Sequence, residues 1–188
     1  GENGVRIAQA RYPASLYPGD IEFIARGGNV QIIVHVFMED YMLGVLPYEM
    51  DNSFPLEALK AQAVAARTYQ VRQMQAAGSR AVLYDVGQAY LSEAEQKEKW
   101  GEGYALYAGK IHSAVRATAG EIMTYDGEPI LAAFHAQSGG RTEDAAHVWN
   151  TAVPYLKSVD SKGDRQAPNN ETTCLLYTSP SPRDMRRS

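Results

Sequence analysis

Residues 39–69 decide the fold, and they read EDYMLGVLPYEMDNSFPLEALKAQAVAARTY. The first part, from Glu39 to about Leu46, has the composition of a short helix. Pro47 lacks a backbone donor and clashes with the preceding turn, so we expect the helix to end or kink there. Glu49 should therefore lie at a bend of the chain, among largely apolar neighbours.

The second part of this stretch predicts a long helix. Ser53 can cap it, Pro55 suits its first turn, and Ala, Leu, Gln, Lys and Arg continue it to about Met74. Lys60 and Arg67 are about two turns apart, so they should project from nearly the same face. The positions that follow the helical period and should face the core are Leu56, Leu59, Ala63, Ala66 and Tyr69 or Gln70.

Predicted strands stand on both sides of these helices. Residues 20–26 and 29–37 are rich in β-branched and aromatic residues, and Gly27-Gly28 between them suits a tight hairpin turn. Residues 121–125 and 129–135 should form a second pair joined at Asp126-Gly127.

Two further helices are expected between these hairpins. One should start after Ser92, where Glu95 completes a capping box. The other should cover about Lys110 to Ala119 and end at Gly120. The order strands, helices, strands predicts a single α+β domain with an antiparallel or mixed sheet.

Composition favours an ordinary globular chain. The 188 residues suffice for one domain, and 45% hydrophobic with 21% charged residues argue against disorder. No apolar run approaches the ~18 residues of a membrane-spanning helix. The chain begins at Gly1 without a leader, which says nothing about secretion because the start of the gene product can simply be absent.

The last 15 residues, 174–188, look foreign to the protein. They resemble the translation of a transposase-type sequencing adaptor, so we expect the natural sequence to stop at about Thr173. We expect residues 1–173 to be a fragment of a longer protein, cut at both ends. Residues 174–188 should be disordered. The tail contains the single cysteine, three arginines and one aspartate. The remaining domain, 1–173, carries 15 basic and 21 acidic residues, a poor composition for nucleic-acid binding.

Glu49 is the candidate general acid. An ordinary surface glutamate is the common outcome, but here the neighbours Leu46, Pro47, Tyr48 and Met50 are largely apolar. Partial burial would raise the pKa of the carboxyl group and keep it protonated near neutral pH. Lys60 and Arg67 are either a solvated helix face or ligands for carboxylate, phosphate or sugar oxygens.

The stretch from His135 to Glu143 forms a glycine-rich loop after a predicted strand. Ser138 lacks the Gly-x-Ser-x-Gly pattern of a nucleophile elbow, because Ala136 stands two residues before it. The four histidines show no close metal-binding pair. A zinc site from His135, His147 and Asp144 stays open as a weaker alternative to ordinary loop histidines.

Three segments together resemble the SpoIID/LytB family, which comprises stage II sporulation protein D and the amidase enhancer LytB. They are Tyr41-x-x-Gly-Val-x-x-x-Glu49-Met, residues 57–69, and Phe134-His-x-x-Ser-Gly-Gly-x-Thr-Glu143 with Val148-Trp149. The resemblance covers about residues 30–160.

The resemblance implies extracytoplasmic work on peptidoglycan. Its sporulation members are lytic transglycosylases that cut between N-acetylmuramic acid and N-acetylglucosamine in strands stripped of stem peptides. The family's catalytic glutamate falls on Glu49. Substrate contacts are implied at Lys60, Arg67, Gln88, His135, Ser138, Gly139, Gly140 and Thr142.

Two departures from the family pattern matter. Some members bind zinc after the long helix, but residues 84–92 contain neither Cys nor His, so we expect no metal and no other cofactor. Ala136 and Gln137 replace small hydroxyl residues of many members in the loop. The expected partners are glycan strands and not nucleic acid. A non-catalytic enhancer that binds a cell-wall amidase, and a metal-dependent hydrolase, remain as alternatives.

Overall fold

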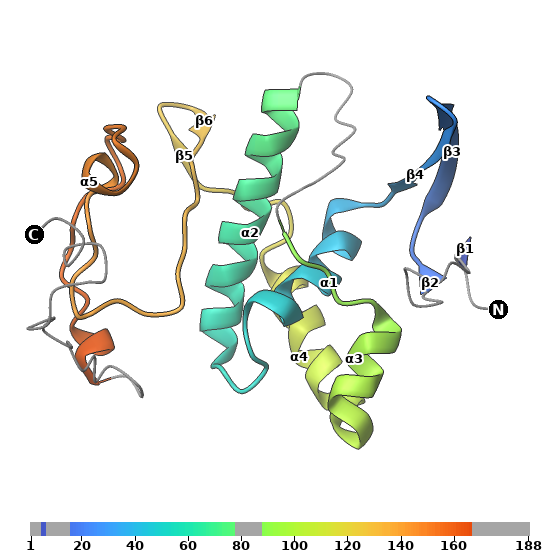
Figure 1. Ribbon diagram of the computed structural model, residues 1–188. Helices are drawn as coiled ribbons and strands as arrows, with labels where there is room; N and C mark the ends of the chain where they lie inside the picture. Colours follow the sequence, from blue (N-terminus) through green and yellow to red (C-terminus); the bar gives the residue numbers. More distant parts are fainter. Residues whose placement is uncertain (1–4, 7–15, 78–87, 167–188) are drawn as a thin grey trace, which may run out of the picture. The chain divides into compact units, whose positions relative to one another are not determined.

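The computed structural model describes residues 5–6, 16–77 and 88–166, which divide between two compact units at Phe134 and His135 (Figure 1). The first unit contains two small antiparallel strand pairs at its start, four α-helices, and a third pair near its end. All strand pairs are antiparallel, so the α+β class is confirmed.

The elements of the first unit are β1 (Val5–Arg6), β2 (Leu16–Tyr17), β3 (Asp20–Arg26), β4 (Asn29–His35), α1 (Met38–Glu49), α2 (Leu56–Ala77), α3 (Glu93–Trp100), the 3-10 turn η1 (Gly101–Gly103), α4 (Tyr104–Ala117), β5 (Thr124–Tyr125) and β6 (Glu128–Pro129). Those of the second unit are α5 (Ala145–Trp149) and the 3-10 turn η2 (Lys162–Gln166). None of the helices among these residues combines the length and the hydropathy that crossing a bilayer requires.

The first predicted hairpin is confirmed. β3 and β4 pair from Arg26 opposite Asn29 to Asp20 opposite His35. Gly27 and Gly28 both have positive φ, at 58° and 80°, which is why glycine suits both turn positions. β4 ends two residues before the expected boundary.

Pro47 lies inside α1, and the helix continues past it to Glu49, so an end of the helix at Pro47 is the part of the expectation that is wrong. A proline at this position leaves the carbonyl of Leu43 without its helical donor. The side-chain amide of Gln96 supplies that donor, with Nε2 at 3.0 Å from the Leu43 oxygen. A contact from a distant helix therefore compensates for the proline.

The long helix α2 begins and ends slightly later than expected. Its first carbonyl acceptor is Pro55, which receives the backbone N–H groups of Ala58 and Leu59. Ser53 does not cap this helix; its backbone and side chain bond to Asp51 instead. Leu56, expected in the core, lies at the surface.

The core of the first unit lies where α1, α2 and α4 contact one another. The alanines of α2 bring the helices close, because a methyl group occupies little space between backbones. The fully packed side chains come from all three helices: Met42, Val45, Leu46, Leu59, Ala63, Ala66, Ile111, Ala114 and Val115.

The capping box before α3 is confirmed. The hydroxyl of Ser92 accepts the Glu95 N–H, and the Glu95 carboxylate accepts the Ser92 N–H at 2.7 Å. The next helix, α4, begins at Tyr104, six residues before the expected start, because the chain passes from α3 through η1 directly into it. Gly120, with φ at 74°, follows its end as expected.

The second hairpin has the expected turn and shorter strands. Asp126 and Gly127 have φ of 51° and 84°, as a tight two-residue turn requires. Only two residues on each side pair, and residues 130–134 form no strand.

The second unit is held by polar contacts around a short helix. Asp144 caps α5, its carboxylate accepting the Ala146 N–H at 2.9 Å. Arg141 and Asp160 form an isolated antiparallel bridge. The sequence patterns predicted neither α5 nor η2.

Candidate functional site

Glu49 is the last residue of α1, where the chain turns out of the helix at Met50. Its side chain is half-buried and lines a hollow of about 180 Å³. The other residues that line this hollow are Tyr69, Gln88, Ala132, Ala133 and Phe134. The acid therefore lies in a concave site within the first unit, beside an aromatic ring and an amide.

Burial raises the pKa of the Glu49 carboxyl group above its ordinary value. This agrees with the direction expected from its apolar neighbours in the sequence. No cation forms an ion pair with Glu49 among the described residues, so nothing there offsets the cost of burying its charge. A carboxyl group in this setting stays protonated to a higher pH than an exposed glutamate.

Gln88, expected as a substrate contact, lies in this hollow and connects two elements of the fold. Its Nε2 donates to the carbonyl of Ala66 on α2 at 3.2 Å. Its Oε1 accepts the hydroxyl of Tyr41 on α1 at 3.4 Å. The amide is thus held between α1 and α2, two of the three helices that build the core.

Tyr41 is held in turn by stacking against Tyr90, with ring centroids 5.9 Å apart and planes 13° from parallel. Tyr90 packs on Gly44, where a Cβ atom would come within 2.1 Å of the ring. This close approach explains why a glycine stands at this position of α1.

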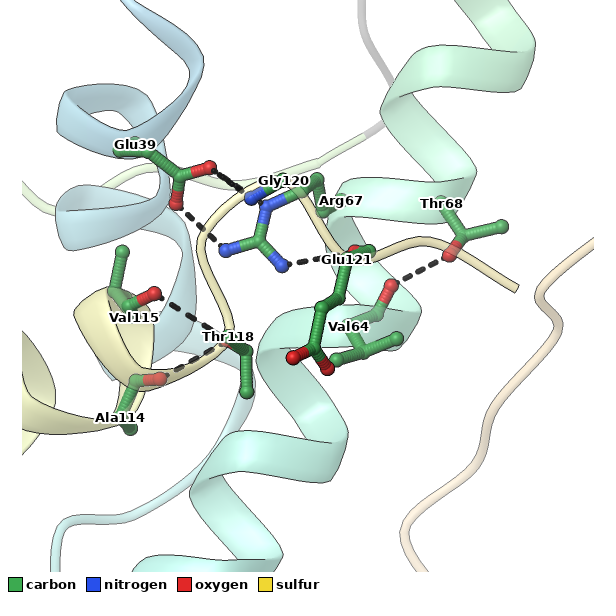
Figure 2. A network of polar contacts seen from close by, with 9 residues as sticks. All are labelled: Glu39, Val64, Arg67, Thr68, Ala114, Val115, Thr118, Gly120 and Glu121. Carbon is green, nitrogen blue, oxygen red and sulfur yellow. Dashed lines mark hydrogen bonds and ion pairs between the residues drawn. The ribbon is translucent and has the colours of Figure 1, made fainter.

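Arg67 is not available as a substrate ligand, which corrects the expectation that it would project beside Lys60. The residue is 1% exposed, and its guanidinium group is directed at Glu39 (Figure 2). Nε lies 3.0 Å from Oε1 of Glu39, and Nη2 lies 2.6 Å from Oε2. Nη1 donates to the carbonyl of Glu121 at 3.1 Å.

The same carboxylate of Glu39 also accepts the backbone N–H of Gly120 at 3.0 Å (Figure 2). Arg67 and Glu39 therefore join α1, α2 and the segment after α4. We interpret the pair as structural.

Lys60 lies two turns earlier on the same helix and is less buried than Arg67. Its ammonium group pairs with Glu57 at 2.6 Å, one turn earlier, and its side chain is only partly exposed. The two cations that the sequence suggested as a joint anchor therefore have separate partners.

The glycine-rich loop belongs to the second unit, where its polar groups support one another. The Ser138 N–H donates to the Asp164 carboxylate at 2.9 Å, and its hydroxyl donates to the same oxygen. Thr142 exchanges bonds with Val159, and its hydroxyl accepts the Val159 N–H at 2.9 Å. These two hydroxyl groups are already engaged within the unit.

The remaining loop positions differ in exposure. Gly140 is buried with φ at 97°, and a Cβ atom there would meet the side chain of Arg165 at 2.3 Å. His135 and Gly139 are exposed. Of the expected loop contacts, these two have surfaces open to a ligand.

The residues of the alternative zinc site have other partners. Asp144 caps α5 and pairs with Lys157 at 3.1 Å. His147 pairs with Glu143 at 2.9 Å. Within residues 5–6, 16–77 and 88–166, no three His, Cys, Asp or Glu side chains are grouped as metal ligands.

The residues that sequence reasoning missed are Glu39, Tyr41 and Tyr69. A glycine inside the predicted helix, at Gly44, was the available signal of a close contact, and the ring of Tyr90 makes that contact. Nothing local in the sequence marks Glu39 as the partner of Arg67, since the two are 28 residues apart.

Comparison with known proteins places this chain in a family. Residues 26–125 match the family model SpoIID, described as Stage II sporulation protein. The chain is 42% identical over 150 residues to "Stage II sporulation protein D" of Bacillus subtilis (strain 168), an alignment that covers 76% of this chain and 44% of that protein. The protein of the same name from Bacillus amyloliquefaciens is 43% identical over 143 residues, covering 72% of this chain and 42% of that protein.

A third relative is the "Amidase enhancer" of Bacillus subtilis (strain 168), 36% identical over 123 residues. That alignment covers 65% of this chain and 15% of the relative. The chain thus spans less than half the length of the curated relatives it matches. The match covers more than half of the chain itself, and the chain belongs to the SpoIID family.

Proposed function

We propose that the domain cleaves peptidoglycan glycan strands as a lytic transglycosylase, with Glu49 as acid and then base. The observation that carries this proposal is the position of Glu49 in a hollow where burial raises its pKa. Among the described residues that line this hollow, it is the one carboxylate. A hydrolytic glycosidase of the usual kind would need a second carboxylate for the incoming water or the covalent intermediate.

The reaction can proceed with one carboxyl group. Protonated Glu49 donates its proton to the oxygen that bridges N-acetylmuramic acid and N-acetylglucosamine, and the bond from the muramic C1 to that oxygen breaks. The 6-hydroxyl of the same muramic residue then attacks C1, and its proton returns to the Glu49 carboxylate. The products are an anhydromuramic end and a free N-acetylglucosamine end, and no water is consumed.

The walls of the hollow suit a sugar. Tyr69 offers an aromatic surface, and Ala132, Ala133 and Phe134 are apolar. Gln88 offers an amide without charge. We propose Lys60 as a further glycan contact of the first unit, and the exposed His135 and Gly139 as glycan contacts of the second unit. The proposed location is extracytoplasmic, where the substrate is found.

The test compares the full-length protein that contains this domain with its Glu49→Gln and Glu57→Gln forms. Each is incubated with glycan strands stripped of stem peptides, and the released fragments are analysed by mass spectrometry. We expect anhydromuramic products from the parent and from Glu57→Gln, whose carboxylate lies on the exposed face of α2. Glu49→Gln should release none; equal release by both variants would refute the role of Glu49.

A second candidate function rests on the relative named "Amidase enhancer". Under this reading the domain binds a cell-wall amidase or its glycan and stimulates the amidase without cleaving the strand. Glu49→Gln would then leave amidase stimulation unchanged, while the parent would release no anhydromuramic product. The two assays together separate the candidates.

A further inference from the structure

The orientation of the Gln88 amide is determined by its two partners. The carbonyl of Ala66 can only accept a hydrogen bond, so the atom that faces it at 3.2 Å is the nitrogen Nε2. The oxygen Oε1 therefore faces Tyr41, whose hydroxyl donates to it at 3.4 Å. A flipped amide would place two acceptors against each other at Ala66.

This arrangement leaves one hydrogen of Nε2 without an acceptor in the described part of the structure. Gln88 is one of the residues that line the hollow beside Glu49. Oε1 already accepts from Tyr41, and Nε2 keeps one hydrogen that it can donate to a ligand. A ligand in the hollow lies beside this amide.

Tyr41 is suited to hold this orientation over a wide pH range. Burial, together with the nearby Tyr90, Glu49 and Tyr69, raises the pKa of Tyr41 to about 12. Its hydroxyl thus remains a donor throughout the physiological range. The stacked ring of Tyr90, seated on Gly44, restricts the movement of the Tyr41 ring.

We propose that Tyr41 is a positioning residue that fixes the Gln88 amide, so that the hollow selects a sugar whose acetamido carbonyl accepts the free Nε2 hydrogen. The site would then distinguish N-acetylated from de-N-acetylated glycan. This inference rests on the proposed function, since it assumes that the hollow binds a glycan strand.

The selectivity follows from the chemistry of the two sugars. An acetamido group carries a carbonyl oxygen that can accept from Gln88. The ammonium group of a de-N-acetylated sugar has hydrogens to donate and no lone pair to accept. A site built to make a hydrogen bond rejects a ligand that leaves it unpaired, here by about tenfold in affinity.

The experiment measures dissociation constants by calorimetry for the tetramer of β-1,4-linked N-acetylglucosamine and for its de-N-acetylated counterpart. All proteins carry Glu49→Gln, which prevents cleavage and removes the negative charge that would attract an ammonium group. We expect the Glu49→Gln protein to prefer the acetylated tetramer about tenfold. Adding Gln88→Met, which keeps the length of the side chain without its donor, should bring the ratio near one.

Adding Tyr41→Phe should reduce the preference severalfold while Gln88 itself is retained. The matched control is Tyr104→Phe, which removes a hydroxyl that donates to Glu93 at 3.1 Å on α3, and it should leave the ratio unchanged. Nuclear magnetic resonance of the Gln88 side-chain amide gives an independent readout, with the signal assigned by its loss in Gln88→Met. In Tyr41→Phe the signal should broaden as the amide becomes mobile.

Each result is decisive. Binding of neither tetramer would refute glycan binding and with it the proposed function. Equal binding of both tetramers would overturn the acetamido inference and leave the proposed function in place. A preference that Gln88→Met abolishes but Tyr41→Phe leaves intact, with an unchanged amide signal, would refute positioning by Tyr41.

Discussion

Removal of Glu39 should destabilise the protein, because Arg67 would remain buried with most of its charge uncompensated. In Glu39→Ala the guanidinium group loses both charge-assisted hydrogen bonds to Glu39 and keeps the carbonyl of Glu121. The backbone N–H of Gly120 loses its acceptor in the same substitution.

The magnitude follows from the burial of the two partners. Breaking a buried ion pair costs about 3–5 kcal/mol when one charge is left behind. The Arg67 side chain is 2% exposed, whereas that of Glu39 is 36% exposed, so water can replace part of the lost interaction. We therefore expect the lower end, about 3 kcal/mol, and a fall in Tm of about 10 °C for a unit of this size.

The assay is urea denaturation followed by circular dichroism, with Glu57→Ala as the matched control. Glu57 also pairs with a cation of α2, but its side chain is 79% exposed, so its removal should cost less than about 1 kcal/mol. A double-mutant cycle with Arg67→Met should give a coupling energy of about 2 kcal/mol or more between Glu39 and Arg67.

The reasoning is refuted if Glu39→Ala costs no more than Glu57→Ala. A stable Arg67→Met protein that has lost glycan binding would also contradict it, since that result is expected of a substrate contact. Loss of stability in both Glu39 and Arg67 variants, with coupling between them, would establish the structural role.

Three smaller predictions concern close contacts in the fold. Gly44→Ala should lower the free energy of unfolding by about 1–3 kcal/mol, because its methyl group would overlap the ring of Tyr90; equilibrium unfolding measures it, and an unchanged value would contradict the stacking. Gln96→Leu should cost about 1–3 kcal/mol, because the carbonyl of Leu43 above Pro47 loses its donor; a hydrogen-exchange experiment should show faster exchange at the end of α1. Gly140→Ala should cost about 1–3 kcal/mol from its positive φ, and a crystal structure would show the neighbouring side chain displaced.

The features predicted correctly from the sequence are those that depend on neighbouring residues. The turn at Gly27-Gly28 and the turn at Asp126-Gly127 follow from backbone conformations that few residues adopt. The capping box of Ser92 and Glu95 likewise needs only a spacing of three residues.

The features that the sequence did not predict depend on contacts between distant residues. Pro47 is accommodated in α1 because Gln96, 49 positions later, satisfies the carbonyl that the proline leaves free. The helical spacing of Lys60 and Arg67 suggested two surface cations. It could not show that Arg67 is buried and paired with Glu39. A seven-residue spacing determines the face of the helix from which two side chains project. It does not determine which of the two is buried by neighbouring elements.

The residues of the hollow likewise divide into those that local sequence could indicate and those that depend on distant contacts. Glu49 could be selected from the sequence, because its apolar neighbours along the chain indicated a raised pKa. The amide geometry of Gln88 could not, because it depends on Tyr41, 47 residues earlier, and on a helix carbonyl. Local chemistry thus selects the candidate acid, and tertiary structure supplies its surroundings.

A final prediction concerns the stability cost of the acid itself. Burial raises the pKa of Glu49 in the folded state above its value in the unfolded chain, so the folded state binds the proton more tightly. At a pH below the unfolded value both states are protonated, and Glu49 costs nothing. As the pH rises toward the folded pKa the unfolded state ionises first, so stability falls, and the loss is complete above the folded value.

Glutamine resembles the protonated form at every pH. Glu49→Gln should therefore be more stable than the parent at pH 7, and the difference should shrink toward zero near pH 3. Urea denaturation at both pH values measures it, with Glu57→Gln as a control whose exposed carboxylate should show no such gain. An acid kept partly buried at a cost in stability is expected of a functional group. If Glu49→Gln is no more stable than the parent at pH 7, the burial of this carboxylate carries no cost and the argument for a tuned acid fails.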